Sequence, residues 1–439
     1  MSRPGYHTLT LGCKLNRFDS AAVEAELERR GYALEADLSA AAVVVVNTCT
    51  VTGKADAEAR RLIRRVRRAN PGCRLLVTGC YAELDPRAVG GIEGVDRVFG
   101  NRDKPRFPVI LDEMGIGSGP EAAAEGDRGC ASVPALRFGG RGRAYLKIQE
   151  GCDLACSYCV IPRVRGRSRS VSPARVEAGF LALAAAGYRE IVLTGVNTGD
   201  WGRDLAPRLS LEALLAKLLE IAGPNRIRLN SLEPLTVTDG ILRLMAGDAR
   251  LAPHLQVPLQ SGSEPVLRAM RRNYRLSQYL ERVGALREAL PDAAIGADVI
   301  VGFPGETGER FEETLRFVES APLDYLHVFA WSPRPGVPAA SLPGRPGGRE
   351  VAERSARLRE LGDRRFLEFR RRFEGRTLDA VVLGERRDDG RWRALTGNFI
   401  EAAVDGEGLA PRRPVNVRIL RAEGAATLAA VEGVPAWAG

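Results

Sequence analysis

Three cysteines near the middle of the chain have a spacing suited to metal binding. They lie in the segment Gly151-Cys152-Asp153-Leu154-Ala155-Cys156-Ser157-Tyr158-Cys159. A compact loop of this kind can place three thiolates at three corners of a four-iron cluster and leave the fourth iron free for a substrate. A tetrahedral zinc site needs a fourth ligand, and none lies nearby. The spacing therefore favours an iron–sulfur cluster over a structural zinc loop or three buried thiols.

Three further cysteines, Cys13, Cys49 and Cys80, are far apart in sequence but occupy equivalent places. Each follows a small residue at the end of a segment that we expect to form a strand. In a parallel sheet all three emerge at the carboxyl edge, which predicts a second three-thiolate site with one open iron. The alternative is three ordinary buried cysteines. We assign Cys73, which begins a strand, and Cys130, in a linker, to neither site.

Composition limits where and how these thiols act. The chain has 439 residues, eight Cys and three His, and it begins without a secretory signal. We therefore expect a cytoplasmic protein whose thiols bind metal, act in catalysis or stay free. No apolar run approaches the roughly 18 residues that a membrane span needs, so we expect no membrane partner. The net charge of +9 is compatible with a polyanionic partner, although only five basic residues are Lys and the Arg bias equally fits a GC-rich genome.

The elements that would carry the separated cysteines alternate between strand and helix. Strand signals cover residues 6–13, 41–49 and 74–80, and helix signals cover residues 19–30 and 55–69. The continuous apolar run Val43-Val44-Val45-Val46 is typical of a parallel strand that is covered on both faces. This pattern predicts an α/β fold that begins with a doubly wound parallel sheet.

The rest of the chain divides into a second α/β region and a β region. Six strand signals separated by helices predict a central partial (β/α)6 barrel, and a charged helix over residues 351–372 is free to leave it. Short β-like runs after that helix predict a small antiparallel β-barrel. The strand signals of the central region cover residues 144–150, 190–197, 226–233, 254–260, 295–302 and 325–331. The domain division is residues 1–112, a linker over 113–137, the partial barrel over 138–372 and the small barrel over 373–439.

The central triplet, with the aromatic Tyr158 before its last cysteine, resembles the radical S-adenosylmethionine superfamily. The resemblance implies that the open iron binds the amino and carboxylate groups of S-adenosylmethionine. One electron then cleaves the sulfonium and yields a 5′-deoxyadenosyl radical. Nothing in the sequence recognisably binds flavin or nicotinamide, so an external reductant such as flavodoxin or ferredoxin is expected.

Polar and glycine residues at the other strand ends are candidates to contact S-adenosylmethionine. The segment containing Gly195 lies where the superfamily has its motif for the methionine amino group. Ser231 and Glu233 offer acceptors suited to a ribose. Each position is equally compatible with ordinary turn chemistry. The candidate residues are Tyr158, Gly195, Asn197, Ser231, Glu233, Gln260 and Asp298.

Six motifs in order resemble the methylthiotransferase family, including Leu11-Gly12-Cys13-Lys14-Leu15-Asn16, Pro258-Leu259-Gln260-Ser261-Gly262-Ser263 and Gly302-Phe303-Pro304-Gly305-Glu306. The resemblance implies two [4Fe-4S] clusters, one on each cysteine triplet, and a C-terminal barrel similar to the TRAM module. It also implies an enzyme in which the N-terminal cluster carries the sulfur. A methyl group from S-adenosylmethionine joins that sulfur, and the radical activates C2 of an adenine.

Within that family, Asn47-Thr48-Cys49-Thr50-Val51-Thr52 resembles the branch that modifies N6-threonylcarbamoyladenosine at position 37, in the anticodon loop of tRNA. The segment Ser332-Pro333-Arg334-Pro335-Gly336 resembles the same branch. The alternatives are methylthiolation of isopentenyladenosine in tRNA or of an aspartate in a ribosomal protein. A non-catalytic iron–sulfur protein that binds RNA is the alternative of a different class.

Arginine clusters are the candidates for contact with the RNA backbone. One follows Cys49, another follows Cys159, and a third lies in the last region. From Glu374 onward that region holds nine Arg and ten acidic residues, so it is not itself basic. Any such cluster is equally compatible with a solvated surface. The candidate RNA-binding residues are Arg64, Arg68, Arg163, Arg165, Arg167, Arg412 and Arg413.

Overall fold

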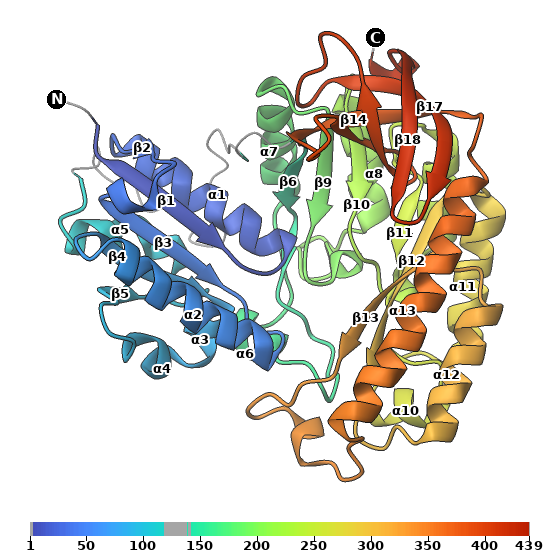
Figure 1. Cartoon of the computed structure of the whole chain (residues 1–439), viewed down its shortest axis with the longest axis horizontal. Coiled ribbons are helices and arrows are strands. Elements are labelled where there is room, and N and C mark those ends of the chain that lie inside the picture. Colours follow the sequence, from blue (N-terminus) through green and yellow to red (C-terminus); the bar gives the residue numbers. More distant parts are fainter. Residues whose placement is uncertain (1–2, 118–137, 139–141, 439) are drawn as a thin grey trace.

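The computed structural model describes residues 3–117, 138 and 142–438. Figure 1 shows an N-terminal α/β part beside a central α/β core, with a small β-barrel against one end of the core. Most of the predicted linker over residues 113–137, including Cys130, lies outside the described residues. In the part of the chain that is described, no helix has the length and apolar character needed to cross a membrane.

The N-terminal part is a parallel sheet with the strand order β2-β1-β3-β4-β5, one of the two common doubly wound orders. Val44 and Val46 of β3 pack with α2 on one face, whereas Val43 and Val45 pack with α1 and α5 on the other. The apolar run is thus buried on both faces, as predicted. The strands are β1 (Gly5–Thr10), β2 (Ala33–Leu34), β3 (Val43–Thr48), β4 (Arg74–Gly79) and β5 (Arg97–Val98). The helices are α1 (Lys14–Arg29), α2 (Gly53–Ala69), α3 (Cys80–Leu84), α4 (Pro86–Gly90) and α5 (Phe107–Glu113).

The central core has the six predicted parallel strands, divided between two three-stranded sheets in the orders β10-β9-β6 and β11-β12-β13. Isolated parallel bridges, Ile227 to Leu251 and Ser231 to Gln256, connect the two sheets into one curved wall. The strands are β6 (Ala144–Lys147), β9 (Glu190–Thr194), β10 (Arg226–Leu229), β11 (His254–Gln256), β12 (Ala294–Val301) and β13 (Tyr325–Ala330). A short ribbon joins β7 (Gln149–Glu150) to β8 (Arg169–Ser170).

Helices cover the outer face of this wall, so the side chains between strands and helices form one large core. The helices are α7 (Pro173–Ala185), α8 (Leu211–Ile221), α9 (Asp239–Gly247), α10 (Glu264–Ala269), α11 (Leu276–Ala289), α12 (Gly308–Ser320) and α13 (Gly348–Arg371). The short helix α6 (Ile161–Arg165) packs instead against α3 of the N-terminal part. The charged helix α13 does not leave the core: it lies along β13 and leads into the barrel (Figure 1). Its buried residues, such as Leu358 and Leu361, join the core cluster.

The C-terminal part is a closed barrel with the order β14-β15-β16-β18-β17, in which only the β16–β18 pair is parallel. Its strands are β14 (Thr377–Arg386), β15 (Trp392–Thr396), β16 (Glu401–Asp405), β17 (Pro414–Glu423) and β18 (Ala426–Gly433). Arg226 and Arg228 of β10 pair with the buried Glu190 of β9 and also reach the barrel. Arg226 contacts Asp379, and Arg228 donates 2.9 Å and 3.0 Å hydrogen bonds to the carbonyls of Gly397 and Thr396. The barrel therefore covers the amino ends of core strands β9 and β10.

Candidate iron–sulfur and nucleic-acid sites

The three separated cysteines meet at the carboxyl edge of the N-terminal sheet. Cys13 precedes α1, Cys49 follows β3, and Cys80 begins α3 directly after β4. The thiol of Cys49 interacts electrostatically with those of Cys80 and Cys13. Gly12 has φ +95°, and a Cβ there would lie 2.9 Å from the Cys49 Sγ, so only glycine lets this loop pass the thiol. The sheet order brings β1 and β3 side by side with opposite connections, which is the switch point where such sheets bind ligands.

The central triplet lies in the loop after β7, at the carboxyl edge of the core. The backbone N–H of Cys152 donates to the Gly166 carbonyl at 3.1 Å, and that of Cys159 donates to the Cys156 carbonyl at 3.2 Å. Burial raises the pKa of Cys152 to about 11 and that of Cys159 to about 12. The Arg272 guanidinium lies 3.3 Å from the Cys156 Sγ and is the nearby positive charge.

Both thiol sets fit a bound iron–sulfur cluster in their chemistry. Burial raises the pKa of Cys49 to about 11, so a free thiol there keeps its proton until a metal replaces it. Within the described residues, no three His, Cys, Asp or Glu side chains converge on a point that could hold a single metal ion. A cluster binds each thiolate to a different iron, so its ligands surround a volume and need not converge on one point. The two sets of thiol donors are therefore compatible with iron–sulfur clusters.

The candidate contacts to S-adenosylmethionine lie near the central triplet, but several are engaged by protein. The Tyr158 hydroxyl lies 3.4 Å from Arg272, whose guanidinium also pairs with Glu233. The Asn197 amide donates to Asp200 at 2.7 Å. A Cβ at Gly195 would lie 2.8 Å from the side-chain oxygen of Gln149, so this glycine is required by packing.

Three other candidates lie along the second half of the wall. Asp298 lies inside β12, within the strand predicted over residues 295–302, and it accepts a 2.7 Å hydrogen bond from Gln256. Gln260 has φ +66°, an uncommon conformation for a non-glycine residue, and its backbone N–H bonds the Asp298 carbonyl at 2.7 Å. The Ser231 carbonyl accepts a 2.8 Å hydrogen bond from the Thr198 hydroxyl. The structure thus groups these residues at one end of the core.

A buried charge network holds the N-terminal part against the core. Asp19 of α1 contacts Lys104 at 2.6 Å, and Lys147 and Arg165 at 3.2 Å each. Burial alone would raise the pKa of Asp19, but these three cations lower it well below its usual range. Arg165 also donates a 2.6 Å hydrogen bond to Asn16 of α1. The two cysteine edges are therefore fixed in relation to one another.

A second buried contact joins the loop after Cys49 to the loop after β13. Arg334 donates to the Thr50 hydroxyl at 2.6 Å and to the Asp56 carboxylate at 2.5 Å. Both Arg334 and Asp56 are largely buried, with side chains 5% and 11% exposed. The backbone N–H of Gly53 donates to the Ser332 hydroxyl at 3.0 Å. The two segments that suggested a common substrate branch are thus in direct contact.

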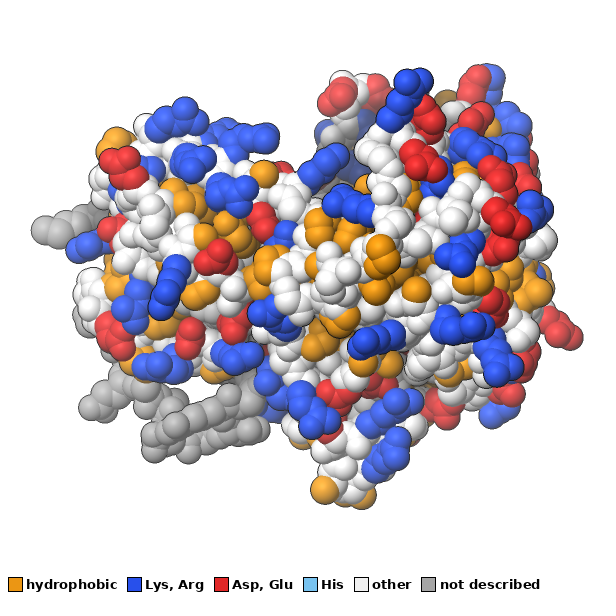
Figure 2. Space-filling view, turned by 90° about the horizontal axis from the view of Figure 1, so that it is seen from below, with side chains coloured by type: hydrophobic (Ala, Val, Ile, Leu, Met, Phe, Trp, Pro, Cys, Tyr) orange, Lys and Arg blue, Asp and Glu red, His pale blue; other side chains and the backbone are white. Residues whose placement is uncertain are grey.

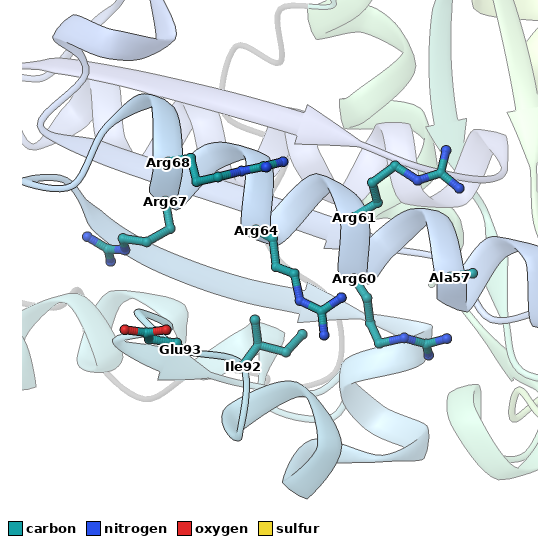
Figure 3. Close-up of a pocket in the computed structure, with 8 residues that line it drawn as sticks. All are labelled: Ala57, Arg60, Arg61, Arg64, Arg67, Arg68, Ile92 and Glu93. Carbon is teal, nitrogen blue, oxygen red and sulfur yellow. The ribbon is translucent and has the colours of Figure 1, made fainter.

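One basic surface lies along α2, where five arginines line an open hollow of about 710 Å³. Arg60 and Arg64 leave the helix on the side that faces Ile92 (Figure 3). Arg60 donates to the Tyr81 hydroxyl and Arg67 pairs with Asp96. Among the residues described, neither Arg64 nor Arg68 has a hydrogen bond or ion pair, and both are exposed. Viewed from below, Lys and Arg side chains are spread over both the N-terminal part and the core (Figure 2).

The structure places the other candidate RNA-binding arginines differently. The prediction for Arg165 is wrong, because its side chain is 1% exposed and is bound by Asp19 and Glu150. Arg163 donates to the Pro335 carbonyl, and Arg167 pairs with Asp153 at 3.2 Å on the surface. Arg412 stacks on Tyr188 where the barrel meets the core. Arg413 is exposed and donates to the Gly408 carbonyl at 2.6 Å.

Four residues that lie beside the candidate sites were not predicted from the sequence. Arg272 touches both Cys156 and Tyr158, yet it follows a helix that carries no recognisable motif. Asn101 lies 3.5 Å from the Cys80 Sγ. Lys14 donates a 2.6 Å hydrogen bond to Asn230 across the gap between the two cysteine edges. Asp19 organises the interface, and only its place in an apolar helix face distinguished it from a solvated carboxylate.

The fold is similar to solved radical S-adenosylmethionine enzymes. The radical S-adenosylmethionine methyltransferase TsrM from Kitasatospora setae, solved with cobalamin and a [4Fe-4S] cluster, gives a TM-score of 0.57 at 17% identity, covering 77% of each chain. The cobalamin-dependent S-adenosylmethionine radical enzyme OxsB gives 0.52 at 14% identity, covering 83% of this chain and 56% of that one. At these identities the likeness concerns the fold alone.

Sequence comparison identifies the family. Residues 146–318 match the Radical SAM superfamily, and residues 5–100 match Uncharacterized protein family UPF0004. Threonylcarbamoyladenosine tRNA methylthiotransferase MtaB of Bacillus subtilis is 36% identical, over 96% of this chain and 94% of that protein. The protein of the same name from Aquifex aeolicus is also 36% identical, over 90% and 96%. The tRNA-2-methylthio-N(6)-dimethylallyladenosine synthase of Thermobifida fusca is 36% identical, over 93% and 84%. The chain therefore belongs to the tRNA methylthiotransferases of the radical S-adenosylmethionine superfamily.

Proposed function

We propose that this enzyme adds a methylthio group to C2 of N6-threonylcarbamoyladenosine at position 37, in the anticodon loop of tRNA. The observation that carries the proposal is the placement of two cysteine triplets on the active edges of two sheets that buried contacts hold together. The relatives from Bacillus subtilis and Aquifex aeolicus bear the name of this reaction and cover nearly the whole chain.

The proposed cofactors are two [4Fe-4S] clusters, one held by Cys13, Cys49 and Cys80 and the other by Cys152, Cys156 and Cys159. When bound, the clusters and S-adenosylmethionine supply the sulfur, the methyl group and the radical. Arg272 positions Tyr158 and Glu233 beside the central triplet. Cys49 and Cys80 are buried, and burial raises the pKa of Cys49 to about 11, whereas Cys13 is exposed and the central triplet is partly exposed, which leaves both sites open to a substrate. An external reductant such as flavodoxin or ferredoxin completes the proposal.

The contacts to S-adenosylmethionine proposed from sequence remain Tyr158, Gly195, Asn197, Ser231, Glu233, Gln260 and Asp298. Glu233 and Asp298 already have protein partners, so they would position neighbouring groups or exchange partners on binding. At Gly195 and Gln260 hydrogen bonds fix the backbone of each loop at a strand end, so a ligand bound there would meet a preformed surface.

The RNA backbone is proposed to contact α2, where Arg64 and Arg68 are exposed and free of protein partners in the described structure. This helix begins four residues after Cys49, and Arg64 and Arg68 lie roughly 16 Å and 22 Å along it from its start, so they would contact phosphates at a distance from the reacting base. Arg163, Arg167 and Arg413 are secondary candidates at the surface. The barrel has a net charge of −1 from Glu374 onward, so the proposal assigns most of the charge contacts to α2.

Nucleoside mass spectrometry of total tRNA tests the proposal. The gene is expressed in a host that lacks its own methylthiotransferases, and the Cys156→Ala variant serves as the matched control. The expected product is 2-methylthio-N6-threonylcarbamoyladenosine, present with the native gene and absent with the variant. A methylthio-dimethylallyladenosine product would support the proposed reaction and contradict the proposed substrate.

Cluster variants test the assignment of the two sites. Cys156→Ala is expected to abolish release of 5′-deoxyadenosine from S-adenosylmethionine under anaerobic reducing conditions. Cys49→Ala is expected to preserve that release and to stop sulfur insertion. Release that persists in Cys156→Ala would contradict the radical assignment, and loss of all iron in Cys49→Ala would mean that the N-terminal cysteines serve folding.

A further inference from the structure

Lys14 is an unusual cation at the junction of the two proposed cluster sites. It follows Cys13 directly, and its ammonium donates a 2.6 Å hydrogen bond to the side-chain oxygen of Asn230, which follows core strand β10. Its side chain is half-buried. Lys14 therefore spans the gap from the N-terminal edge to the core edge.

The other lysines near this interface are neutralised, whereas Lys14 is not. Lys104 and Lys147 both pair with Asp19, at 2.6 Å and 3.2 Å. Lys14 forms no ion pair with any carboxylate among the residues that the structure describes, and its hydrogen-bond partner Asn230 is a neutral amide. Glu190 and Asp298 act on it only at longer range, against the like charges of Arg143 and Arg228.

Such an arrangement favours an incoming anion. An ammonium has three donors, and the Asn230 bond uses one of them. Removing a cation from water without a counter-charge is unfavourable, and a carboxylate or phosphate that enters the gap relieves that cost. Lysine is also rare here, at five of 64 basic residues, so arginine would be the ordinary choice for a surface cation in this chain.

We propose that Lys14 binds the carboxylate of the threonyl group on the substrate adenosine and so determines substrate specificity. The inference rests on the proposed function. Of the two adenosines that the relatives are named for, the threonylcarbamoyl form carries a carboxylate and the dimethylallyl form is neutral. An ammonium between the two cysteine edges would reach the substituent of a base that both sites must approach. It would favour the charged substrate over the neutral one.

The competing role is a purely structural bridge to Asn230. Binding is therefore measured with two anticodon stem-loop RNAs, one with threonylcarbamoyladenosine and one with its primary amide, which lacks only the charge. The variants are Lys14→Gln, the conservative Lys14→Arg, and Lys217→Gln as a control on the exposed face of α8. Fluorescence anisotropy gives the affinity of each RNA for the native protein and for the three variants, all with their clusters reconstituted.

Loss of a charge-assisted hydrogen bond weakens binding by roughly ten- to a hundredfold. Lys14→Gln is expected to weaken binding of the carboxylate RNA by that factor and to leave binding of the amide RNA nearly unchanged. Lys14→Arg is expected to keep most of the preference, and Lys217→Gln all of it. Equal loss on both RNAs would overturn the proposal in favour of a structural bridge.

S-adenosylmethionine also carries a carboxylate, so its binding is a separate outcome. We expect Lys14→Gln to release 5′-deoxyadenosine at the native rate without RNA. A slower release that is rescued by more S-adenosylmethionine would assign Lys14 to that ligand and overturn the proposal. Failure of the proposed function looks different: the native enzyme would modify a dimethylallyladenosine RNA and not the threonylcarbamoyl RNA.

Discussion

The buried contact between Arg334 and Asp56 helps to hold the two cysteine edges in a fixed position relative to one another, and the effect of losing it can be predicted. We consider Arg334→Met, which keeps the length and apolar stem of the side chain and removes its charge. The change leaves Asp56 buried at 11% side-chain exposure and takes one donor from the buried Thr50 hydroxyl. The loop after Cys49 then loses its polar attachment to the loop after β13.

Removing one partner of a buried ion pair costs about 3–5 kcal/mol. The Nε of Arg334 is buried without a hydrogen-bond partner, so the native contact is imperfect and the lower value applies. At 1.36 kcal/mol for each factor of ten, about 3 kcal/mol corresponds to an opening roughly 150-fold more frequent. The expected change is local, because neither the core nor the barrel depends on this contact.

Amide hydrogen exchange measures the opening at a single reporter. The N–H of Gly53 bonds the Ser332 hydroxyl across the same contact at 3.0 Å, so its exchange follows separation of the two loops. Arg345→Met is the matched control, since Arg345 stacks on Trp331 in the same segment without reaching α2. Exchange at Gly53 within threefold of the native rate in Arg334→Met would refute the reasoning. A second readout is the ratio of 5′-deoxyadenosine to methylthio product, which we expect to rise.

Three further changes have definite expectations. Asp19→Asn leaves Lys104 without its carboxylate and leaves Lys147 and Arg165 to share Glu150, so the thermal midpoint of the apoprotein should fall by several degrees for a loss of about 3 kcal/mol; an unchanged midpoint would mean that the network is neutral. In Gly79→Ala the new Cβ would lie 2.3 Å from the Thr48 carbonyl at φ +100°, so iron content should fall, whereas Gly72→Ala, with open space, should keep it. Arg64→Glu should weaken RNA binding and reduce the slope of log affinity against log salt concentration by at least the value of one phosphate contact. Arg349→Glu on α13 is the control, and an equal slope in the two variants would exclude the α2 surface as an RNA-binding site.

The pattern of apolar residues and the positions of Gly and Pro predicted the architecture closely, because both depend on local conformational preferences and burial. The apolar run Val43–Val46 indicated a strand covered on both faces, and the structure confirms it. The strand over residues 6–13 was predicted too long, since the chain leaves the sheet after Thr10 and turns at Gly12. A strand end depends on where the neighbouring strand stops, which local sequence does not record.

The candidate site was predictable where residue type alone decides the chemistry, as for the six cysteines. Their assignment to two clusters stays a prediction. Contacts between distant segments were not predicted, because they join residues that are hundreds of positions apart in sequence. Examples are the contacts of Arg334 with Asp56 and of Lys14 with Asn230. Arg165 shows the converse error: an arginine in a basic run suggested phosphate binding, although its surroundings turn it inward onto Asp19.

The attachment of the small barrel makes it an integral part of the core. Phe399 stacks on His254 at 4.1 Å between ring centroids, and the fully buried Arg226 and Arg228 donate to barrel carbonyls. A chain truncated before β14 would expose this aromatic pair and leave two guanidinium groups sharing the single carboxylate of Glu190. Exchange of the barrel between relatives therefore has to carry the residues at positions 226, 228 and 254 with it. Replacement of the C-terminal segment alone would produce an unstable chimera in place of an enzyme with altered RNA preference.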